Sequence, residues 1–342
     1  MKSRTTWVVL ALLGAVLLPA AAQAAAGAGA IVLSFPVGAR YNALGEVGVG
    51  LAQDVSATWF NPGGLAFLPD WNARTDLQIM HSQIAAGLAD DMGLYSLGAA
   101  FAGSGGGVLA GSFTYLDMGE QEAVDENGTV TGTFSSNEFV VQLNYGFKLS
   151  PTVGLGFGAK YFRDHLAPDD VLQDQTGGSG WSYAFDAGLL KKFPGPRVNL
   201  GVALMNLGPK DITHVDEDQA DPMPRKAAVG FGWQPYQSEF LGLLLAADYQ
   251  VPLYEWKDND YGWGFDTSQN EWGAGAEANY DRSLFLRLGY KSADYGDIND
   301  MTFGFGVDLS KWADMALRFD FASVPQAEGL DRVNRFSLGY RF

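Results

Sequence analysis

The chain has 342 residues, of which 47% are hydrophobic and only 18% charged, and its formal net charge is −17. A nucleic-acid-binding protein needs a basic surface, so this charge argues against that class. The absence of cysteine excludes a disulfide framework, a thiolate metal site, a cysteine nucleophile and a lipid anchor on cysteine.

Residues 1–24 have the features of a cleaved signal peptide. Lys2 and Arg4 precede an apolar run from Trp7 to Leu18, and Ala22-Gln23-Ala24 fits the small-residue cleavage rule. The alternative is a transmembrane anchor, but the run of about a dozen apolar residues is shorter than the ~20 that a spanning helix needs. We therefore expect an exported protein whose mature chain begins near Ala25.

Residues 25–73 differ in pattern from the rest of the chain. Near the end of this segment lies the run Trp59-Phe60-Asn61-Pro62-Gly63-Gly64. Asn-Pro is a dipeptide that begins turns, and Gly-Gly permits backbone conformations that other residues avoid. We expect an irregular segment that precedes the first strand.

From residue 74 onward the hydrophobic pattern has a period of two. Apolar residues occupy one face of each segment and polar or small residues the other, as in a strand with one apolar face. Fourteen strands of about ten residues are predicted, near 74–80, 94–102, 108–117, 138–148, 153–164, 181–192, 197–206, 225–233, 241–251, 270–280, 283–292, 301–309, 313–323 and 332–342. An even number of strands of this length is typical of an all-β, antiparallel transmembrane barrel, here over residues 74–342.

The connections between these strands alternate between long and short. Long ones lie near 118–137, 207–224 and 252–269, whereas Pro194-Gly195-Pro196 and Asp281-Arg282 are tight turns. Long loops at one end, short turns at the other and both termini on the periplasmic side are the pattern of an outer-membrane barrel. A secreted β-sandwich, the alternative, has no reason to sort its loops in this way. The chain also ends on an aromatic residue, Phe342, which resembles the signal that directs barrels to the outer membrane.

A fourteen-stranded barrel encloses more space than its own side chains fill, so it is a channel or it is plugged. Residues 25–73 have about the right length for a luminal hatch. The run from Gly38 to Leu65 resembles the N-terminal signature of the PorV/PorQ family, which is related to the FadL-type long-chain fatty-acid transporters. Asn61-Pro62-Gly63 matches the Asn-Pro-Ala motif of the transporter hatch, with glycine in place of alanine.

The resemblance implies a fourteen-stranded barrel with an N-terminal hatch in its lumen. The transporter branch captures apolar molecules in external loops and releases them through the barrel wall. In the mechanism expected for this chain, loop aromatics bind the ligand, the hatch around Asn61-Pro62-Gly63 shifts, and a gap in the wall releases the ligand sideways. The PorV branch is an accessory of type IX protein secretion that docks cargo or partner subunits at the cell surface. Both functions remain open, and the expected partners are outer-membrane lipid and lipopolysaccharide, a hydrophobic small molecule, and secretion-system subunits.

Two sets of residues are candidates for binding. The first is polar and is predicted to face the lumen, where it can pair with the hatch or merely hydrate the interior: Arg40, Glu46, Asp186, Asp248, Glu277, Arg287, Arg318 and Asp320. The second consists of aromatic residues in an acidic long loop, which suit the capture of an apolar ligand or have no such role: Tyr254, Trp256, Tyr261 and Trp263.

Catalysis is not expected. The three histidines, His81, His165 and His214, fall in predicted long loops, and no motif supplies a partner for a general base. The acidic runs 125–128 and 258–260 lack the full spacing of a calcium loop, so solubility explains them better than a cation site. The sequence therefore indicates neither a metal nor a cofactor.

Overall fold

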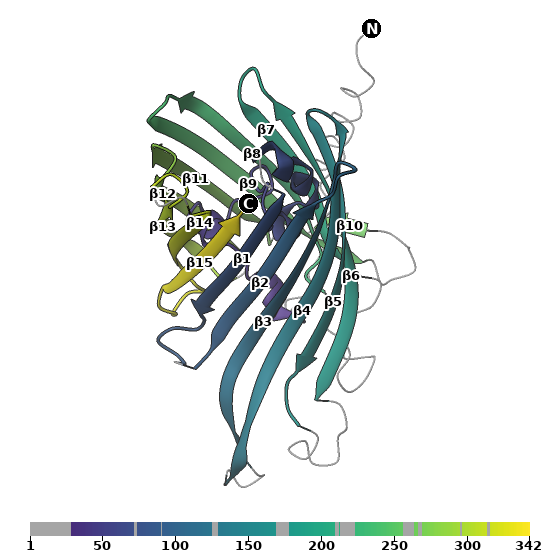
Figure 1. Ribbon diagram of the computed structural model, residues 1–342. Helices are drawn as coiled ribbons and strands as arrows, with labels where there is room; N and C mark the ends of the chain where they lie inside the picture. The colour runs from purple at the N-terminus through teal and green to yellow at the C-terminus, as the bar shows by residue number, and fades with distance from the viewer. Residues whose placement is uncertain are drawn as a thin grey trace.

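The computed structural model describes residues 29–342 except 72–73, 90, 125–128, 169–177, 209–211, 213–222, 256–262, 266–268, 295 and 313–314. The predicted signal peptide lies outside these residues. Fourteen antiparallel strands form a closed barrel, because β15 pairs with β1 and β9 pairs with both β8 and β11 (Figure 1). A short strand, β10, adds to the edge of β9 outside this cylinder. The fourteen-stranded antiparallel barrel predicted from the sequence is confirmed.

The strands have the following bounds: β1 Thr75–Gln83, β2 Gly93–Ala102, β3 Gly107–Val124, β4 Val130–Ser150, β5 Val153–His165, β6 Ser179–Phe193, β7 Val198–Leu207, β8 Lys226–Gln237, β9 Leu241–Glu255, β10 Trp263–Phe265, β11 Glu271–Tyr280, β12 Leu284–Ala293, β13 Ile298–Asp308, β14 Leu317–Val324 and β15 Val333–Arg341.

Several strand boundaries differ from the sequence prediction. β3 and β4 continue into the long loop expected at 118–137 and form a projecting ribbon, since β-branched residues from Val130 to Thr133 favour extended backbone. The register shifts between Asp117 and Glu120, where Gly119 has a φ of +74°. β14 begins at Leu317, later than predicted, so one connection at the short-turn end is longer than the pattern suggested.

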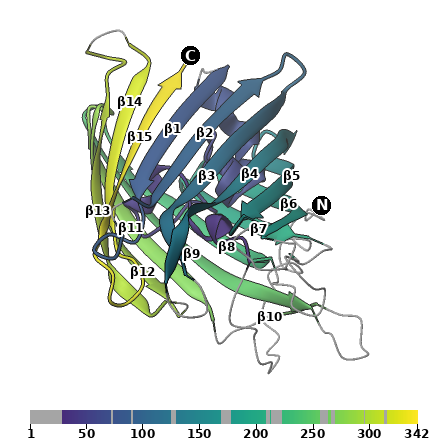
Figure 2. The ribbon, with the colours of Figure 1, turned by 90° about the horizontal axis from the view of Figure 1, so that it is seen from below.

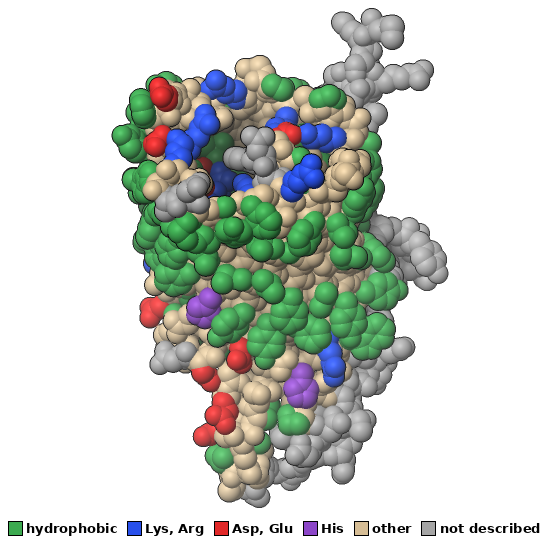
Figure 3. All heavy atoms as spheres, in the orientation of Figure 1, with side chains coloured by type: hydrophobic (Ala, Val, Ile, Leu, Met, Phe, Trp, Pro, Cys, Tyr) green, Lys and Arg blue, Asp and Glu red, His purple; other side chains and the backbone are tan. Residues whose placement is uncertain are grey.

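The two ends of the barrel are named here by their connections. The long-loop end carries the β3–β4 ribbon and lies at the bottom of Figure 1, and the short-turn end carries Phe342 and lies at the top. Hydrophobic side chains cover the outer wall in a band between the two ends, with charged groups beyond each edge (Figure 3). Among the described residues, no helix is long and apolar enough to cross a membrane.

The segment Ala30–Trp71, called the plug below, lies inside the ring of strands (Figure 2). It contains four short helices: η1 Ile31–Ser34, α2 Ala39–Asn42, α3 Ala57–Phe60 and η2 Pro62–Trp71. η1 contacts β3 and β4, α2 contacts β13 to β15, and η2 contacts β3 to β6. Most of the plug residues are buried, so the barrel has its apolar core where plug and wall meet.

Glycines on the inner wall let the plug backbone approach the strands closely. A Cβ atom at Gly156 of β5 would lie 2.2 Å from the Pro62 carbonyl, and one at Gly201 of β7 would lie 2.0 Å from the Val49 carbonyl oxygen. The same holds for further inward glycines: Gly146, Gly154, Gly230, Gly273, Gly275 and Gly289. The 44 glycines of the chain therefore include a set that shapes the seat of the plug.

Adding one methyl group at this seat is expected to destabilise the protein. Gly156→Ala places a Cβ against rigid backbone of the plug, so we expect a loss of about 1–3 kcal/mol or more in the free energy of unfolding. The matched control is Gly195→Ala in the β6–β7 turn, where no atom lies within 4 Å of a Cβ. Denaturant titrations in detergent measure both variants, and equal stability of the two would contradict this account of the seat.

Candidate functional site

The Asn61-Pro62-Gly63 motif fastens the plug to the wall. The Asn61 side-chain amide donates to the Val49 carbonyl at 2.8 Å and to the Leu189 carbonyl of β6 at 3.1 Å. Its oxygen accepts a hydrogen bond from the Gly63 N–H at 3.0 Å. Asn61 is fully buried, so the motif joins two parts of the plug and one strand at a single point.

Neighbouring residues of the predicted hatch site add packing contacts around this motif. A Cβ at Gly64 would lie 1.8 Å from the Ala52 carbonyl oxygen, which explains why only glycine fits there. The Phe60 ring packs against Tyr41 with ring centroids 5.2 Å apart. Trp59 is buried, and the ammonium of Lys160 on β5 lies over its ring. These contacts make the region an anchor of the plug.

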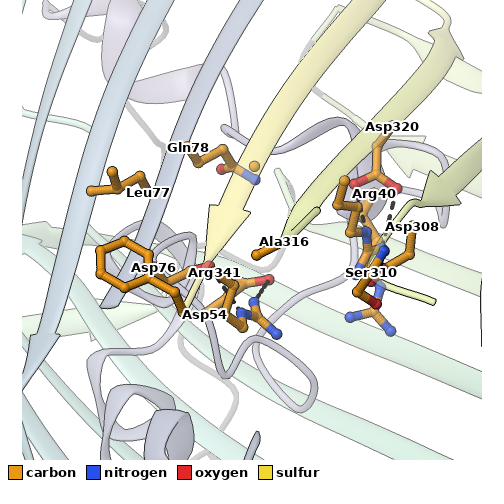
Figure 4. A pocket seen from close by; sticks show the side chains of 13 residues that line it. Arg40, Asp54, Asp76, Leu77, Gln78, Asp308, Ser310, Ala316, Asp320 and Arg341 are labelled. Carbon is orange, nitrogen blue, oxygen red and sulfur yellow. Dashed lines mark hydrogen bonds and ion pairs between the residues drawn. The ribbon is translucent and has the colours of Figure 1, made fainter. Parts of the chain in front are cut away.

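A chain of ion pairs joins the plug to the wall nearer the short-turn end. Figure 4 labels Arg40 and Asp320, which belong to this chain. Arg40 of α2 binds Glu277 of β11 through two N–H groups, at 3.0 and 2.9 Å. Arg287 of β12 donates to the same carboxylate at 2.7 Å and forms an ion pair with Asp320 of β14, with the two charged atoms 2.8 Å apart. Arg318 completes the chain on Asp320 at 2.9 Å. Five predicted lumen residues thus form one network across the plug–wall boundary.

Glu46 is the second ionic contact of the plug. Its carboxylate accepts hydrogen bonds from Lys291 of β12 at 2.5 Å and Arg335 of β15 at 3.2 Å. Burial alone would raise the pKa of Glu46, but the two cations outweigh it and hold this pKa below its ordinary value of 4.5. The residue also has a φ of +62°, which L side chains rarely adopt. The ionic contacts offset this local strain.

The Glu46 contact predicts an acid-sensitive plug. Because the folded-state pKa is the lower one, the stability from Glu46 is complete above its unfolded pKa and is lost as pH falls through the folded value. We expect protease cleavage of the plug to increase below about pH 4. Glu46→Gln removes the titrating group, so this variant should be cleaved more readily at pH 7 and should show a smaller further change with acid. An identical pH profile for both proteins would contradict the role assigned to Glu46.

A cleft of about 250 Å³ lies between the plug and strands β1, β13, β14 and β15. Arg341 of β15 lies on one side, 3.0 Å from Asp76 of β1 and 3.8 Å from Asp54 of the plug. Arg40 and Arg318 line the other side. Carboxylates therefore neutralise the guanidinium groups of the cleft, and the short-turn end shows charges of both signs around a hollow (Figure 3).

The lumen between the plug and the long-loop end contains a cluster of buried apolar side chains. Leu94 of β2, Leu116 of β3 and Phe162 of β5 face inward and are at most 2% exposed. They belong to one cluster with Val32 and Leu33 of η1, and the same cluster includes Val140, Ala184, Ile212 and Met223. The Val32 N–H donates to the Glu138 carboxylate at 2.7 Å, which holds η1 in place. The members outside the plug named here, from Leu94 to Met223, are called the upper cluster below, although the long-loop end beside which they lie is drawn at the bottom of Figure 1.

The wall is irregular beside the upper cluster. β7 ends at Leu207 opposite Phe185, six residues before the long-loop end of β6, and the ladder shifts register between Phe185 and Ala187. The bulged residue Asn206 has a φ of +59°. Its N–H donates to Asp186 at 2.8 Å, and Lys160 donates to its side-chain oxygen at 2.6 Å. A buried polar group thus holds the point where strand pairing between β6 and β7 stops.

A family model described as type IX secretion system protein PorV matches residues 20–240, which is more than half of the chain. The chain belongs to the PorV family. A search of curated proteins by sequence gave no match. The family resemblance stated from the residues around Asn61-Pro62-Gly63 is therefore confirmed.

This PorV-family chain also resembles solved structures of hydrocarbon channels. The Ralstonia pickettii toluene transporter TbuX has 12% identity and a TM-score of 0.56, with 90% of this chain and 98% of that chain covered. The Pseudomonas putida toluene transporter TodX has 15% identity and a TM-score of 0.54, with 87% and 95% covered. At such identities the similarity shows a shared fold. The PorV-family protein is an outer-membrane β-barrel.

The remaining predicted residues of this PorV-family barrel lie apart from the upper cluster or cannot be placed. Asp248 of β9 accepts the N–H groups of Gly48 and Val49 at 2.6 and 2.7 Å, so it holds the plug loop. Tyr254 belongs to β9 and Trp263 to β10 by backbone. Trp256, Tyr261 and His214 lie outside the described residues.

The two described histidines lie on strands, His81 on β1 and His165 at the end of β5, so their predicted place in long loops was wrong. His81 stacks on Tyr95 with ring centroids 4.8 Å apart, and His165 shares a hydrogen bond with Ser179 at 2.8 Å. In the part of the chain that the structure describes, no group of three or more His, Asp or Glu side chains is placed to hold a metal ion.

Five cations that contact the plug were missed in the sequence, namely Lys148, Lys192, Lys291, Arg335 and Arg341. Lys291, Arg335 and Arg341 lie on the inward face of their strands, as their spacing from Arg287 and Ser337 in the period-two pattern indicates. That spacing could have identified them as luminal. Their plug partners could not be found in this way, because the plug has no regular period.

Proposed function

We propose that this PorV-family barrel captures hydrophobic molecules at its long-loop end, which faces the cell exterior. The observation that carries the proposal is the upper cluster. The interior of an aqueous channel is polar, whereas here Leu94, Leu116 and Phe162 line the lumen beside the long loops. Such a lining disfavours water and suits an apolar ligand.

Val32 and Leu33 occupy the space that this ligand would take. The sequence-based mechanism moves the hatch at Asn61-Pro62-Gly63, but that motif is held by buried hydrogen bonds on both sides. η1 is held to the wall by a single described hydrogen bond from its backbone, at Val32. We therefore assign the movement to η1, which gives way to the ligand while the rest of the plug stays in its seat.

The proposed release is sideways, between β6 and β7. The upper cluster includes Ala184 of β6, directly beside the end of the β6–β7 ladder. Separating the strands there breaks few ladder bonds, because pairing already stops at Phe185. Lys160, Asp186 and Asn206 act as the closure of this exit.

Binding of radiolabelled oleate in detergent tests the capture step. Phe162→Ala removes a fully buried ring, so we expect binding to weaken about tenfold or more, from a loss of roughly 1.5–3 kcal/mol. The matched control is Phe157→Ala on the same strand, whose ring is 50% exposed on the outer face and should leave binding unchanged. Heat-dependent gel mobility shows that each variant is folded. If both variants bind oleate like the unaltered protein, the upper cluster is not the site.

A second function is favoured by the family match. The matching family is described as a type IX secretion protein, so the barrel is also a candidate accessory that docks cargo or partner subunits through its outer loops. Chemical cross-linking in native membranes tests this: secretion subunits joined to the barrel, together with no oleate binding, would favour docking over capture.

A further inference from the structure

Two basic side chains end the outer face of β5 at the long-loop end. The outward positions of this strand are apolar from Leu155 to Tyr161 and then become Arg163 and His165. Arg163 is exposed and lies directly between Phe139 of β4 and Trp181 of β6 in the ladder. An arginine thus follows the aromatic rings at the end of the apolar outer face.

The depth of Arg163 follows from the neighbouring strand. The outward residues of β6 run from Lys191 near the short turns to Trp181, which is 49% exposed and opposite Arg163. The ten residue steps that separate them, at roughly 3.3 Å each and a tilt of about 40°, span about 25 Å, the height of the apolar band of a barrel. Lys191 therefore marks one membrane boundary and Arg163 the other.

Arg163 has no ion pair among the residues that the structure describes, and its cross-strand neighbours are aromatic rings. A guanidinium at the lipid boundary has lost part of its hydration and is stabilised by an anion, above all by a phosphate that accepts two parallel hydrogen bonds. His165 lies two residues further along the same face. Its Nδ1 shares a hydrogen bond with Ser179, so the ring is oriented and Nε2 remains as a second contact for the anion.

We propose that Arg163 and His165 bind a phosphate of the lipid A part of lipopolysaccharide, in the outer leaflet of the membrane. The proposal rests on the orientation given under the proposed function, with the long-loop end outside. Phe139 and Trp181 flank the phosphate and pack against the acyl chains below it. The site lies one strand from the end of the β6–β7 ladder, so the bound lipid borders the proposed exit.

Mass spectrometry of lipids retained after mild detergent extraction tests the site. The double variant Arg163→Ala/His165→Ala should retain roughly tenfold less lipid A per barrel, since it loses charge-assisted hydrogen bonds. Arg163→Lys should retain an intermediate amount. The control is Lys191→Ala at the opposite boundary, which should retain lipid A like the unaltered protein. Equal retention by the double variant and the control would overturn the proposal.

Two further measurements distinguish a wrong assignment of the lipid from a wrong orientation of the barrel. If the double variant loses phosphatidylglycerol as strongly as lipid A, or if inorganic phosphate displaces the lipid, the site is a general phosphate site and the assignment to lipid A is wrong. The orientation is tested with Gly132→Cys on the β3–β4 ribbon, in a chain that has no other cysteine. Labelling of this thiol on intact cells supports the orientation, and labelling only after membrane disruption would overturn it independently of the lipid result.

Discussion

Replacing Glu277 with glutamine is expected to lower the free energy of unfolding by about 3–5 kcal/mol, because it leaves two buried arginines without their shared anion. Glu277 is 3% exposed and accepts hydrogen bonds from Arg40 of the plug and Arg287 of the wall. Glutamine keeps the shape of the side chain but has one acceptor oxygen and no charge. Guanidinium titrations in detergent micelles, followed by tryptophan fluorescence, measure the change.

The control for this substitution is Asp308→Asn, which lies on the same cleft but accepts its described hydrogen bond from the backbone N–H of Ser310. It should change stability by less than about 1 kcal/mol. A double-mutant cycle with Arg40→Gln then isolates the plug–wall pair, and the two losses should add to more than the loss in the double variant. Strict additivity would show that Arg40 and Glu277 do not stabilise one another.

The wall of the barrel could be predicted from the sequence because a strand with one apolar face repeats every two residues. In β5, Phe157 and Tyr161 face outward while Lys160 and Phe162 face inward, as the alternation requires. The same alternation placed Glu277 and Arg287 in the lumen. It failed at the β3–β4 ribbon, since a strand that leaves the membrane no longer needs an apolar face and its end is not marked in the pattern.

The path of the plug could not be predicted, because its contacts are set by the shape of the wall. Asn61-Pro62-Gly63 is visible as a turn in the sequence, yet its anchoring role depends on the Leu189 carbonyl more than a hundred residues away. The pairing of Glu46 with Lys291 and Arg335 likewise joins residues with no local relation. The high glycine content of the sequence indicated that backbones approach one another closely. Only the fold shows which plug residue each inward glycine contacts, as Gly156 contacts Pro62.

Locking the end of the β6–β7 ladder with a disulfide is expected to stop the release of an apolar ligand without preventing its capture. Phe185 and Leu207 are direct cross-strand partners, and opposite Cβ atoms in a sheet lie about 4.5–5.5 Å apart, near the distance that a disulfide spans. The chain has no cysteine, so Phe185→Cys/Leu207→Cys introduces the only pair. Oxidised cells should take up radiolabelled oleate no faster than cells without the barrel, and a reductant should restore uptake.

The matched control separates a closed exit from a stiffened barrel. Leu189→Cys/Val202→Cys joins the same two strands on the short-turn side of the register shift, where the ladder is continuous. This disulfide should leave uptake unchanged when oxidised. Oleate binding to the purified protein should be equal in both locked pairs, because the upper cluster is untouched by either. If the disulfide between positions 185 and 207 forms completely and uptake persists, the ligand leaves the barrel at another place. If uptake falls in both pairs, strand separation is needed along the whole of β6–β7, and the polar group of Lys160, Asp186 and Asn206 is a structural tie within the wall.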